Sequence, residues 1–531
     1  MGSSNHMGAS IEVRTARDEG IDAGLSRSAE RWGSRPALAF GDRTWSYREF
    51  DDAVTDAARA LRSHGYEDGA RLAFFGKNSD AFLIAFFATL RAGYVHVPVN
   101  FALTGAELAH ILEDSGASAV YTDPGLRDTA LDVLDEVPAQ SVRPLYGSEE
   151  GLLEQVLAGV GKEPRSRTRS DSIGAPAASA DDVVQLLYTS GTTSKPKGAV
   201  HTHASLRAQY ESCIMALSLD PEDAPLIAMP LYHSAALHVF AVPYLSIGAS
   251  LRLIEKPDVP QILDLVERER IGSLFLAPTV WVPLANHPDL GRRDLSSLSK
   301  AQYGASIMPV AVLETLRAQY PEIGFYNCFG QSELGPLTCV LGPEEHDERP
   351  ASCGKPVHNV RARIMTSDGL PARIGEPGEI QYRGPQVCTG YWNLPEDTAE
   401  SFKDGWFRSG DQVVMDDGGF IEVVDRIKDV INTGGIVVAS REIEDVIYRY
   451  DGVAEVAVVG TPDDRWIEAV TAFVVPKEGA ALTSDGLLRH VREHLAPFKV
   501  PKRVEFVNEL PRNQSGKILK RDLRSAASKG R

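Results

Sequence analysis

Apolar and polar residues succeed one another along the first two thirds of the chain in units that predict strands followed by helices. Residues 70–75 and 94–99 are short apolar runs typical of buried strands, and residues 79–92 between them have the length of a helix. The same succession returns with an apolar run at 273–276 and a helical pattern at 310–320. Strands that alternate with helices predict a layered α/β domain.

The pattern shortens after Gly375. Short strand-and-turn units predict a smaller β-rich region that ends near Val424. Beyond it, apolar runs at 453–459 and 471–475 and a helical pattern at 487–495 predict a compact α+β unit.

Length and charge set further limits. A chain of 531 residues, with 43% hydrophobic and 24% charged residues, has the composition of a soluble folded protein and exceeds the size of one ordinary core. Its net charge of −18 argues against non-specific binding of nucleic acid. The last 43 residues are basic, with 12 Lys and Arg against 4 Asp and Glu, which suits a phosphorylated substrate.

Neither the cysteines nor the apolar stretches indicate export or a membrane. Five cysteines without CxxC spacing favour a reducing compartment, so we expect a cytoplasmic protein without a disulfide framework or a structural metal. Residues 1–10 have no signal pattern and are expected to be a cloning leader. The longest apolar stretches, 81–90 and 235–247, are too short or too interrupted to span a bilayer, so no stable membrane insertion is expected.

A loop rich in hydroxyls, glycines and lysines follows the apolar run at 183–188. Residues 188–198 read Tyr-Thr-Ser-Gly-Thr-Thr-Ser-Lys-Pro-Lys-Gly. Backbone N–H groups around glycine, hydroxyl donors and a lysine charge together suit phosphate. The order Gly-Lys-Ser/Thr of a Walker A loop is missing, which excludes that motif. Taken alone, such a run is more often a solvated loop.

Four more segments follow this loop in a recognisable order. They read Tyr-Asn-Cys-Phe-Gly-Gln-Ser-Glu at 326–333, Gly-Trp-Phe-Arg-Ser-Gly-Asp at 405–411, Asp-Arg-Ile-Lys-Asp at 425–429 with Gly434 and Gly435, and Leu-Pro-Arg-Asn-Gln-Ser-Gly-Lys-Ile at 510–518. Together the five segments resemble the adenylate-forming superfamily, which includes acyl-CoA synthetases, aryl-CoA ligases, peptide-synthetase adenylation domains and firefly luciferase. The resemblance is closest to fatty or aryl acyl-CoA ligases.

The resemblance implies a fold and a domain organisation. It implies an α/β protein with a large layered N-terminal adenylation domain at residues 11–424, which includes the β-rich subdomain and holds ATP and the acyl group. A hinge at 425–428, centred on Lys428, would join it to a small mobile α+β lid at 429–531 that carries the catalytic lysine and the CoA site.

The resemblance also implies a nucleotide site. Phe329 would stack on adenine, and small residues around Gly304 would cover the other face of the base. Asp411 would accept the ribose hydroxyls, and Arg426 would donate to the sugar or a phosphate. The implied ATP-binding residues are Thr189, Ser190, Gly191, Thr192, Thr193, Lys197, Gly304, Ala305, Ser306, Asn327, Phe329, Gly330, Asp411 and Arg426.

Three residues carry the implied catalysis. Joining a carboxylate to ATP brings two anions together, so electrostatic stabilisation and positioning should dominate. Lys517 resembles the family lysine that contacts the acyl carboxylate and the α-phosphate, although a lysine in a basic tail is also a common surface residue. Glu333 would coordinate Mg²⁺, since this cation prefers carboxylate and phosphate oxygens. Ser332 would place its hydroxyl on the α-phosphate.

An acyl pocket is implied around His233, which resembles the residue that gates the carboxylate, although a lone histidine is often a core residue. The implied acyl-binding residues are His233, Leu237, Thr279, Tyr303 and Leu334. No aspartate stands near His233 to anchor an ammonium group, which disfavours an α-amino acid. Apolar and small pocket residues favour an aliphatic chain.

A CoA site is implied by residues 498–502, which resemble the segment of aryl-CoA ligases that stacks on the CoA adenine and contacts its phosphates. The implied CoA-binding residues are Gly434, Gly435, Trp466, Phe498, Lys499 and Lys502. The chain departs from the pattern at Val500, at Ile436 with Val437, and at Ile467, where a polar residue or glycine is usual. These departures leave the shape of the thiol tunnel open.

The sequence therefore predicts an acid–thiol ligase that uses ATP, Mg²⁺ and CoA to convert a medium-chain or long-chain aliphatic acid into an acyl adenylate and then a thioester. The alternative is a ligase that delivers the acyl group to a carrier protein, whose usual extra insertion is not evident between Glu333 and Asp411. A luciferase-like oxygenase and a nucleotide-binding scaffold without catalysis are more remote alternatives.

Overall fold

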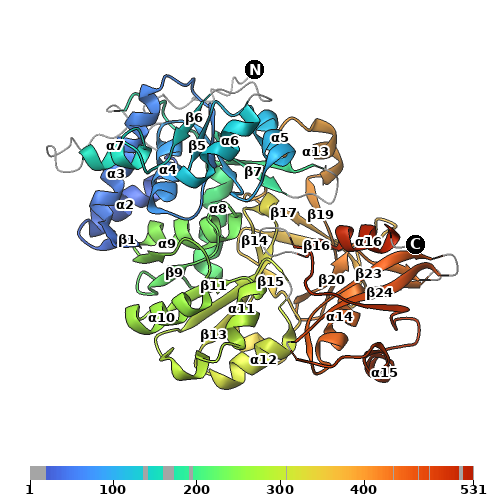
Figure 1. Cartoon of the computed structure of the whole chain (residues 1–531). Helices are drawn as coiled ribbons and strands as arrows, with labels where there is room; N and C mark the ends of the chain where they lie inside the picture. Colours follow the sequence, from blue (N-terminus) through green and yellow to red (C-terminus); the bar gives the residue numbers. More distant parts are fainter. Residues whose placement is uncertain are drawn as a thin grey trace, which may run out of the picture.

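The computed structural model describes residues 19–134, 141–159, 173–189, 195–306, 308–427, 429–433, 436–463, 466–477, 479–512 and 518–529 (Figure 1). The expected leader at 1–10, the hinge residue Lys428 and the catalytic candidate Lys517 lie outside these residues. Within the described chain, no helix is both long and apolar enough to cross a bilayer.

The first large sheet is mostly parallel and lies at the N-terminal end of the molecule, in blue and cyan in Figure 1. Its strands, in spatial order, are β6 (Val142–Pro144), β5 (Ala119–Thr122), β3 (Arg71–Phe75), β4 (Val95–Val99), β7 (Val183–Thr189) and β8 (Lys197–Thr202). One face packs on α5 (Gly105–Ser115) and α6 (Arg127–Leu134). The other packs on α3 (Tyr47–Ser63), α4 (Asp80–Arg91) and α7 (Leu152–Gly159).

The second large sheet lies beside the first. Its strands, in spatial order, are β15 (Lys355–Pro356), β14 (Leu337–Leu341), β13 (Gly324–Gly330), β12 (Lys300–Gly304), β11 (Ser273–Leu276), β9 (Pro225–Ile227), β10 (Leu251–Leu253), β1 (Pro36–Phe40) and β2 (Arg43–Ser46). One face is covered by α10 (Val259–Glu269), α11 (Pro278–Ala285) and α12 (Val310–Gln319). The other is covered by α2 (Ala23–Trp32), α8 (His203–Ala216), η2 (Ala235–Ala241) and α9 (Val242–Ile247).

Helix α4 explains how the two sheets share one core. Its sequence is apolar on every side, and all of its residues are buried. A helix of this kind is stable only when it is covered all round. Ser79 begins the helix by accepting a hydrogen bond from the N–H of Phe82 at 3.1 Å. The prediction for residues 79–92 is therefore confirmed to within one residue at each end.

The β-rich region is an antiparallel sheet of β16 (Arg361–Met365), β17 (Gly378–Arg383), β19 (Trp406–Met415), β18 (Phe402–Lys403) and β20 (Ile421–Arg426). It begins at Arg361, before the predicted start at Gly375, because β16 pairs with β17 across the turn that contains this glycine. A short helix, α13 (Pro395–Ser401), interrupts the strands.

The smaller C-terminal domain, orange and red in Figure 1, has its own sheet and core. Its strands are β22 (Ile436–Val438), β21 (Ile431–Thr433), β24 (Ile467–Pro476), β23 (Val453–Asp463) and β25 (Arg503–Phe506). Helices α14 (Ser440–Tyr448) and α15 (Ser484–His494) cover one face, and α16 (Lys520–Lys529) packs on β23. The change from one sheet to the other falls between Arg426 and Ile431. A large α/β domain and a small β-rich domain are thus confirmed.

Candidate active site

The hydroxyl-rich loop joins two antiparallel strands of the first sheet. Thr189 at the end of β7 pairs with Lys197 at the start of β8, and the Thr189 hydroxyl lies 3.5 Å from the Lys197 carbonyl oxygen. The strand ends that flank the loop therefore lie side by side. The predicted phosphate-binding residues Ser190, Gly191, Thr192 and Thr193 lie outside the described part of the chain.

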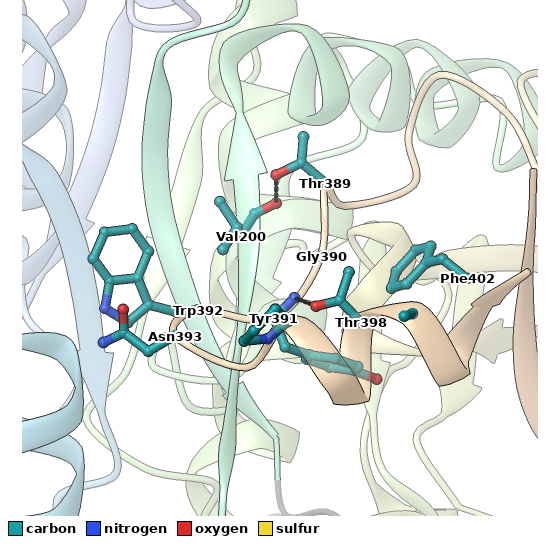
Figure 2. A pocket seen from close by; sticks show the side chains of 10 residues that line it. Val200, Thr389, Gly390, Tyr391, Trp392, Asn393, Thr398 and Phe402 are labelled. Carbon is teal, nitrogen blue, oxygen red and sulfur yellow. Dashed lines mark hydrogen bonds between the residues drawn. The ribbon is translucent and has the colours of Figure 1, made fainter.

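Lys197 is held on the α13 side of the site. Its ammonium group forms an ion pair with Asp397 in the first turn of α13, and it lies 5.3 Å from the centre of the Tyr391 ring. Figure 2 shows Tyr391 among the side chains that line a pocket of about 510 Å³ between β8 and α13. Lys197 was predicted to bind ATP, and Asp397 with Tyr391 was not anticipated from the sequence.

Glu333 lies on the short 3₁₀ turn η4 (Ser332–Leu334) that follows β13. The hydroxyl of Tyr391 donates to Glu333 Oε1 at 2.9 Å, and the N–H of Cys388 donates to the Glu333 carbonyl oxygen at 2.8 Å. The Glu333 carboxylate is half-buried, and the hydrogen bond from Tyr391 fixes its orientation. It suits a divalent cation, because a hard cation prefers carboxylate oxygens next to hydroxyl and phosphate groups.

Ser332 contacts two residues from other elements. Its hydroxyl oxygen lies 3.1 Å from that of Ser234, and its carbonyl oxygen accepts a hydrogen bond from His201 Nε2 at 2.8 Å. Burial lowers the pKa of His201 to about 4, so the imidazole is neutral and donates from one nitrogen. Sequence reasoning did not identify His201, since its partner is 131 positions away.

Two strand ends of the second sheet meet at the predicted adenine site. β12 ends at Gly304 and β13 at Gly330, and the two strands run parallel with Gly304 opposite Cys328. A Cβ atom at Gly304 would lie 2.1 Å from the Cys328 carbonyl oxygen, so only glycine fits there. Phe329 is half-buried on β13.

The remaining predicted adenine residues cluster at the same edge. Ala305 adopts a φ of 64° directly after β12, and Ser306 follows it. The amide nitrogen of Asn327 donates to the carbonyl oxygen of Ser352 at 2.9 Å, so its donor is used within the protein.

The two residues predicted at the ribose face each other across neighbouring strands. Asp411 on β19 is opposite Arg426 on β20, and Arg426 Nε lies 2.6 Å from Asp411 Oδ1. Asp411 is only 2% exposed. Carboxylate oxygens accept hydrogen bonds from hydroxyl donors, as binding of a ribose would require.

The predicted acyl-binding residues divide into two groups. His233 precedes η2, a π-helix that carries the buried Leu237, and Leu334 belongs to the same core cluster as Leu237. π-Helical turns are rare and are often found at functional sites. Burial lowers the pKa of His233 to about 4, so it is neutral at pH 7.

Tyr303 and Thr279 lie on other elements. Tyr303 belongs to the core beneath α10, α11 and α12, where its hydroxyl is 2.9 Å from His346 Nε2. Thr279 is half-buried on α11. The N–H of Leu237 donates to the His233 carbonyl oxygen at 3.5 Å, Leu334 is buried in the same extended core as Leu237, and Tyr303 lies in a different cluster.

On the C-terminal domain the structure brings two predicted CoA residues together. The Lys502 ammonium lies 5.1 Å from the centre of the Trp466 ring. Lys499 lies 5.8 Å from the Phe498 ring and donates to Glu442 at 2.6 Å. Gly434 and Gly435 lie outside the described residues.

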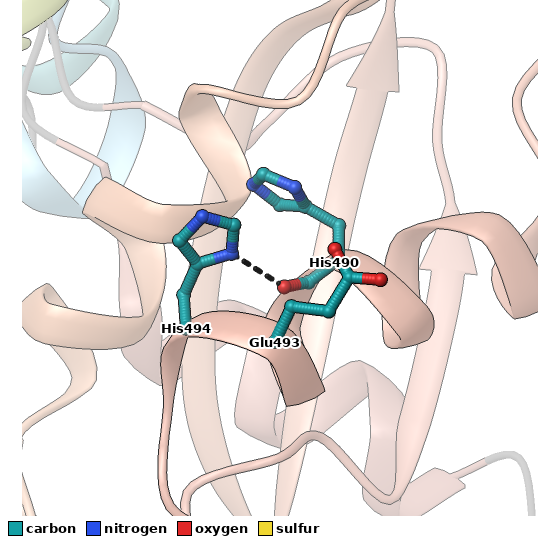
Figure 3. A group of neighbouring side chains, drawn as sticks. All are labelled: His490, Glu493 and His494. Atoms are coloured by element: carbon teal, nitrogen blue, oxygen red, sulfur yellow. Dashed lines mark hydrogen bonds between the residues drawn. The ribbon is translucent and has the colours of Figure 1, made fainter.

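A group of metal-ligand types in the described chain lies far along the sequence from Glu333, on α15. His490, Glu493 and His494 share one face of the helix (Figure 3), with candidate ligand atoms within 4.8 Å of one another. His490 Nε2 lies 3.1 Å from the Val446 carbonyl oxygen and His494 Nδ1 lies 2.8 Å from that of His490. Each ring thus uses one nitrogen on the backbone, and Glu493 and His494 are exposed. We assign no ion to this group.

Comparison with known proteins shows the family of this chain. Residues 25–392 match the AMP-binding enzyme family, and residues 442–517 match the AMP-binding enzyme C-terminal domain. A feruloyl-CoA synthase of Amycolatopsis sp is 36% identical over 510 residues, which cover 96% of this chain and 99% of that protein. A medium/long-chain-fatty-acid–CoA ligase of Mycobacterium tuberculosis is 33% identical over 513 residues, with 94% and 89% covered.

Solved structures also match this chain over almost its whole length. The crystal structure of ATP-bound MatB from Rhodopseudomonas palustris matches with a TM-score of 0.86 at 29% identity, and the match covers 96% of this chain and 99% of that one. Family, relatives and fold agree over almost the whole chain. The chain therefore belongs to the AMP-binding enzyme family, within the adenylate-forming superfamily, and to the acyl-CoA ligases of that family.

Proposed function

We propose that this protein is an ATP-dependent acyl-CoA ligase that activates a medium-chain or long-chain aliphatic carboxylic acid as its acyl adenylate and then transfers the acyl group to CoA. The observation that carries the proposal is the contact between Ser234 and Ser332 at 3.1 Å. It joins the segment next to the acyl gate, His233, to the turn that holds Glu333. An acid carboxylate and an α-phosphate bound at these two segments would meet at this contact.

The first half-reaction needs two anions to approach. His233 is neutral at pH 7, so it can orient the acid without forming an ion pair that would hold the carboxylate back from the phosphorus. The Ser332 hydroxyl would donate to an α-phosphate oxygen while pyrophosphate leaves. Bound at Glu333, Mg²⁺ would neutralise part of the phosphate charge.

Two further groups would complete this half-reaction. Asp411 would hold the ribose, and Lys517 would place its charge between the carboxylate and the α-phosphate. The oxygen that attacks comes from the acid, the bond to pyrophosphate breaks, and the acyl adenylate remains.

The proposed acid class rests on the apolar residues at and near the predicted acyl site. Leu237 and Leu334 are buried and apolar, and Phe240 on η2 stacks on Phe275 with ring centres 4.6 Å apart. Apolar walls suit an aliphatic chain. The relative named as a medium/long-chain-fatty-acid ligase supports this choice.

A substituted arylpropenoic acid is the second candidate. A relative that is 36% identical is named a feruloyl-CoA synthase. The stacked pair of Phe240 and Phe275 offers aromatic surface on which a planar ring can also pack.

CoA is the acceptor that the C-terminal residues favour. Trp466 and Lys502 lie together as an aromatic face beside a positive charge, which suits an adenine ring and its phosphates. A carrier protein remains the alternative acceptor, since its phosphopantetheine arm would need the same thiol path.

The test is mass spectrometry of the products formed from ATP, Mg²⁺ and a ladder of saturated acids, with ferulic acid included, in the presence and absence of CoA. Acyl-CoA with an optimum among the longer saturated acids supports the proposal. A marked preference for ferulic acid replaces the aliphatic substrate with the second candidate. Acyl adenylate that persists despite added CoA indicates a carrier protein.

One variant connects the acid to the pocket. Leu237→Trp adds bulk next to the predicted acyl gate, so the optimum should move to shorter acids while ATP use without CoA is retained. Leu263→Trp, on α10 in the separate core beneath the sheet, is the matched control for disturbed packing. An unchanged optimum in Leu237→Trp would exclude this wall from the acyl pocket.

A further inference from the structure

Each oxygen of the Asp411 carboxylate contacts a different side chain. Arg426 Nε lies 2.6 Å from Oδ1, and Gln331 Nε2 donates to Oδ2 at 2.7 Å. The arginine lies on the neighbouring strand, whereas the glutamine directly follows β13 of the second large sheet, 80 positions earlier in the chain. A carboxylate held at both oxygens has little freedom to rotate.

The orientation of the Gln331 amide is set by its surroundings. Nε2 donates both to Asp411 and to the carbonyl oxygen of Ser409, at 3.0 Å. A reversed amide would place Oε1 against two acceptors, so the observed orientation is the only favourable one. In this orientation, Oε1 is buried and has no hydrogen-bond partner among the described residues.

Burial of this oxygen destabilises the folded protein, because an amide oxygen that leaves water and finds no donor loses its hydrogen bonds. A residue chosen for packing alone would avoid it, and a methionine of similar length would fill the same space. Unsatisfied buried polar atoms in native proteins call for an explanation, and one explanation is function.

The backbone of Gln331 is also fixed. Its N–H donates to the Pro336 carbonyl oxygen at 2.9 Å, and its carbonyl oxygen accepts from the N–H of Leu334 at 2.9 Å. These bonds close the turn that carries Ser332 and Glu333. The side chain of Gln331 is therefore a direct link between this turn and the carboxylate of Asp411.

We infer that Gln331 is a positioning residue for the nucleotide: it orients the Asp411 carboxylate toward the ribose hydroxyls and holds the ribose in register with the turn at Ser332 and Glu333. The inference rests on the proposed function. A carboxylate oxygen can accept more than one hydrogen bond, so contacts with Gln331 and Arg426 are compatible with hydrogen bonds from ribose hydroxyls. Without the amide, the carboxylate can turn toward the guanidinium group and away from the sugar.

The test compares nucleotides that differ only at the ribose. Acyl-adenylate formation is measured with ATP, 2′-deoxy-ATP and 3′-deoxy-ATP for the wild-type protein and for Gln331→Met. For Gln331→Met, we expect kcat/KM to fall about tenfold with ATP, as for loss of one hydrogen bond to a charged group, and clearly less with the deoxynucleotides. The preference for ATP over the deoxynucleotides should therefore narrow.

Two further variants separate positioning from disturbed packing. Gln302→Met removes another buried glutamine, which bonds to Ser273, and should leave the ratio between ATP and the deoxynucleotides as in the wild type. Gln331→Glu places a second carboxylate against Asp411 and can donate only when protonated. Its activity relative to the wild type should therefore recover as the pH falls.

The outcomes are distinct. A wild-type protein that forms no acyl adenylate contradicts the proposed function. An active wild type together with equal losses for all three nucleotides in Gln331→Met overturns the positioning role of Gln331. A Gln331→Glu variant with the same relative activity at every pH also overturns it.

Discussion

The hydroxyl of Tyr391 donates a hydrogen bond to Glu333 Oε1 at 2.9 Å, although the two residues are 58 positions apart. The ring of Tyr391 also lies 5.3 Å from the ammonium of Lys197, which is paired with Asp397. One tyrosine thus contacts the expected metal ligand and the lysine of the phosphate loop.

Tyr391→Phe should raise the Mg²⁺ concentration needed for half-maximal adenylation by about five- to tenfold, the effect of losing one hydrogen bond. The ring and its contacts with Lys197 and Phe402 would remain, whereas Glu333 would lose its orientation. A Mg²⁺ titration of pyrophosphate release measures this. Tyr382→Phe is the control, because the buried Tyr382 hydroxyl has no partner among the described residues. Equal Mg²⁺ requirements in both variants would contradict the role of Tyr391.

Lys520→Met should destabilise the C-terminal domain by about 3 kcal/mol, because it leaves the charge of Glu444, whose side chain is only 14% exposed, uncompensated. Lys520 Nζ lies 2.7 Å from Glu444 and donates to Ser440 Oγ at 2.6 Å, and Ser440 Oγ donates to Asp425 at 2.6 Å. This relay connects α16 to the end of β20. Urea denaturation measures the loss.

Two comparisons check the assignment of this relay. Arg521→Met, next to Lys520 but with a side chain 57% exposed, should cost less than about 1 kcal/mol. Adding Glu444→Gln to Lys520→Met should recover part of the loss, since the uncompensated charge is then removed. A Lys520→Met variant as stable as Arg521→Met would contradict the prediction.

Ile467→Gly should stabilise the protein by about 0.5–1 kcal/mol. Ile467 adopts a φ of 67°, and this conformation costs a β-branched residue about 1–2 kcal/mol. Glycine removes this strain but loses about 0.5–1 kcal/mol through its greater conformational entropy in the unfolded chain. Little burial is lost, because Ile467 is 60% exposed. Thermal denaturation measures the gain. Ile467→Ala keeps a Cβ atom and should gain less; a destabilised Ile467→Gly variant would show that the side chain contributes more than the strain costs.

Stability should fall as the pH is lowered below about 6.5. Burial lowers the pKa of His96 to about 3 and of His201, His233 and His346 to about 4. The unfolded chain therefore binds protons that the folded chain does not, and each histidine removes about 1.4 kcal/mol per pH unit between pH 6.5 and its folded pKa. Denaturant midpoints measured across this window test the slope.

Asp123, a buried carboxyl group, changes stability in the opposite direction. Burial raises the pKa of Asp123 to about 6, so the folded chain binds one proton more than the unfolded chain between about pH 4 and 6. Burial also raises the pKa of Asp445, but two carboxyl groups cannot offset four histidines, and the net loss of stability on acidification should remain. Replacing His96 with Gln should reduce the pH slope, and an unchanged slope would exclude that histidine from the effect.

Lys517→Ala should abolish acyl-adenylate formation yet leave thioester formation from supplied acyl adenylate largely intact. The lysine charge is needed while two anions are joined, whereas the second step starts from the adenylate. Separate assays of the two half-reactions measure this, with the exposed Lys477→Ala as the control. Equal loss of both steps would remove Lys517 from the adenylation site.

Local elements were predictable where apolar runs end at clear capping residues. The helix expected at 79–92 is α4, and the strand expected at 183–188 is β7, extended by one residue. Patterns of this kind report nearest neighbours along the chain, so they locate elements well. They do not report which face of a sheet a residue will occupy when both faces are covered.

Tyr303 illustrates that limit. The family resemblance implied Tyr303 at the acyl pocket, and that role stays a prediction. Only the structure showed that Tyr303 on β12 lies with Ala301 in the core beneath α10 to α12, because side chains alternate along a strand. The contacts of His201 and Gln331 were likewise not evident, because their partners come from other elements 131 and 80 positions away.

The sequence by itself determined the family and the class of chemistry, because the glycine, hydroxyl, carboxylate and lysine segments are short local motifs that can be read without any pairing. Only the tertiary structure decided which partners these residues take: Asp397 for Lys197, Tyr391 for Glu333, Gln331 for Asp411 and Ser234 for Ser332. The physical reason is that each of these contacts joins separate elements, and their approach depends on how whole sheets and helices pack rather than on neighbouring residues in the chain.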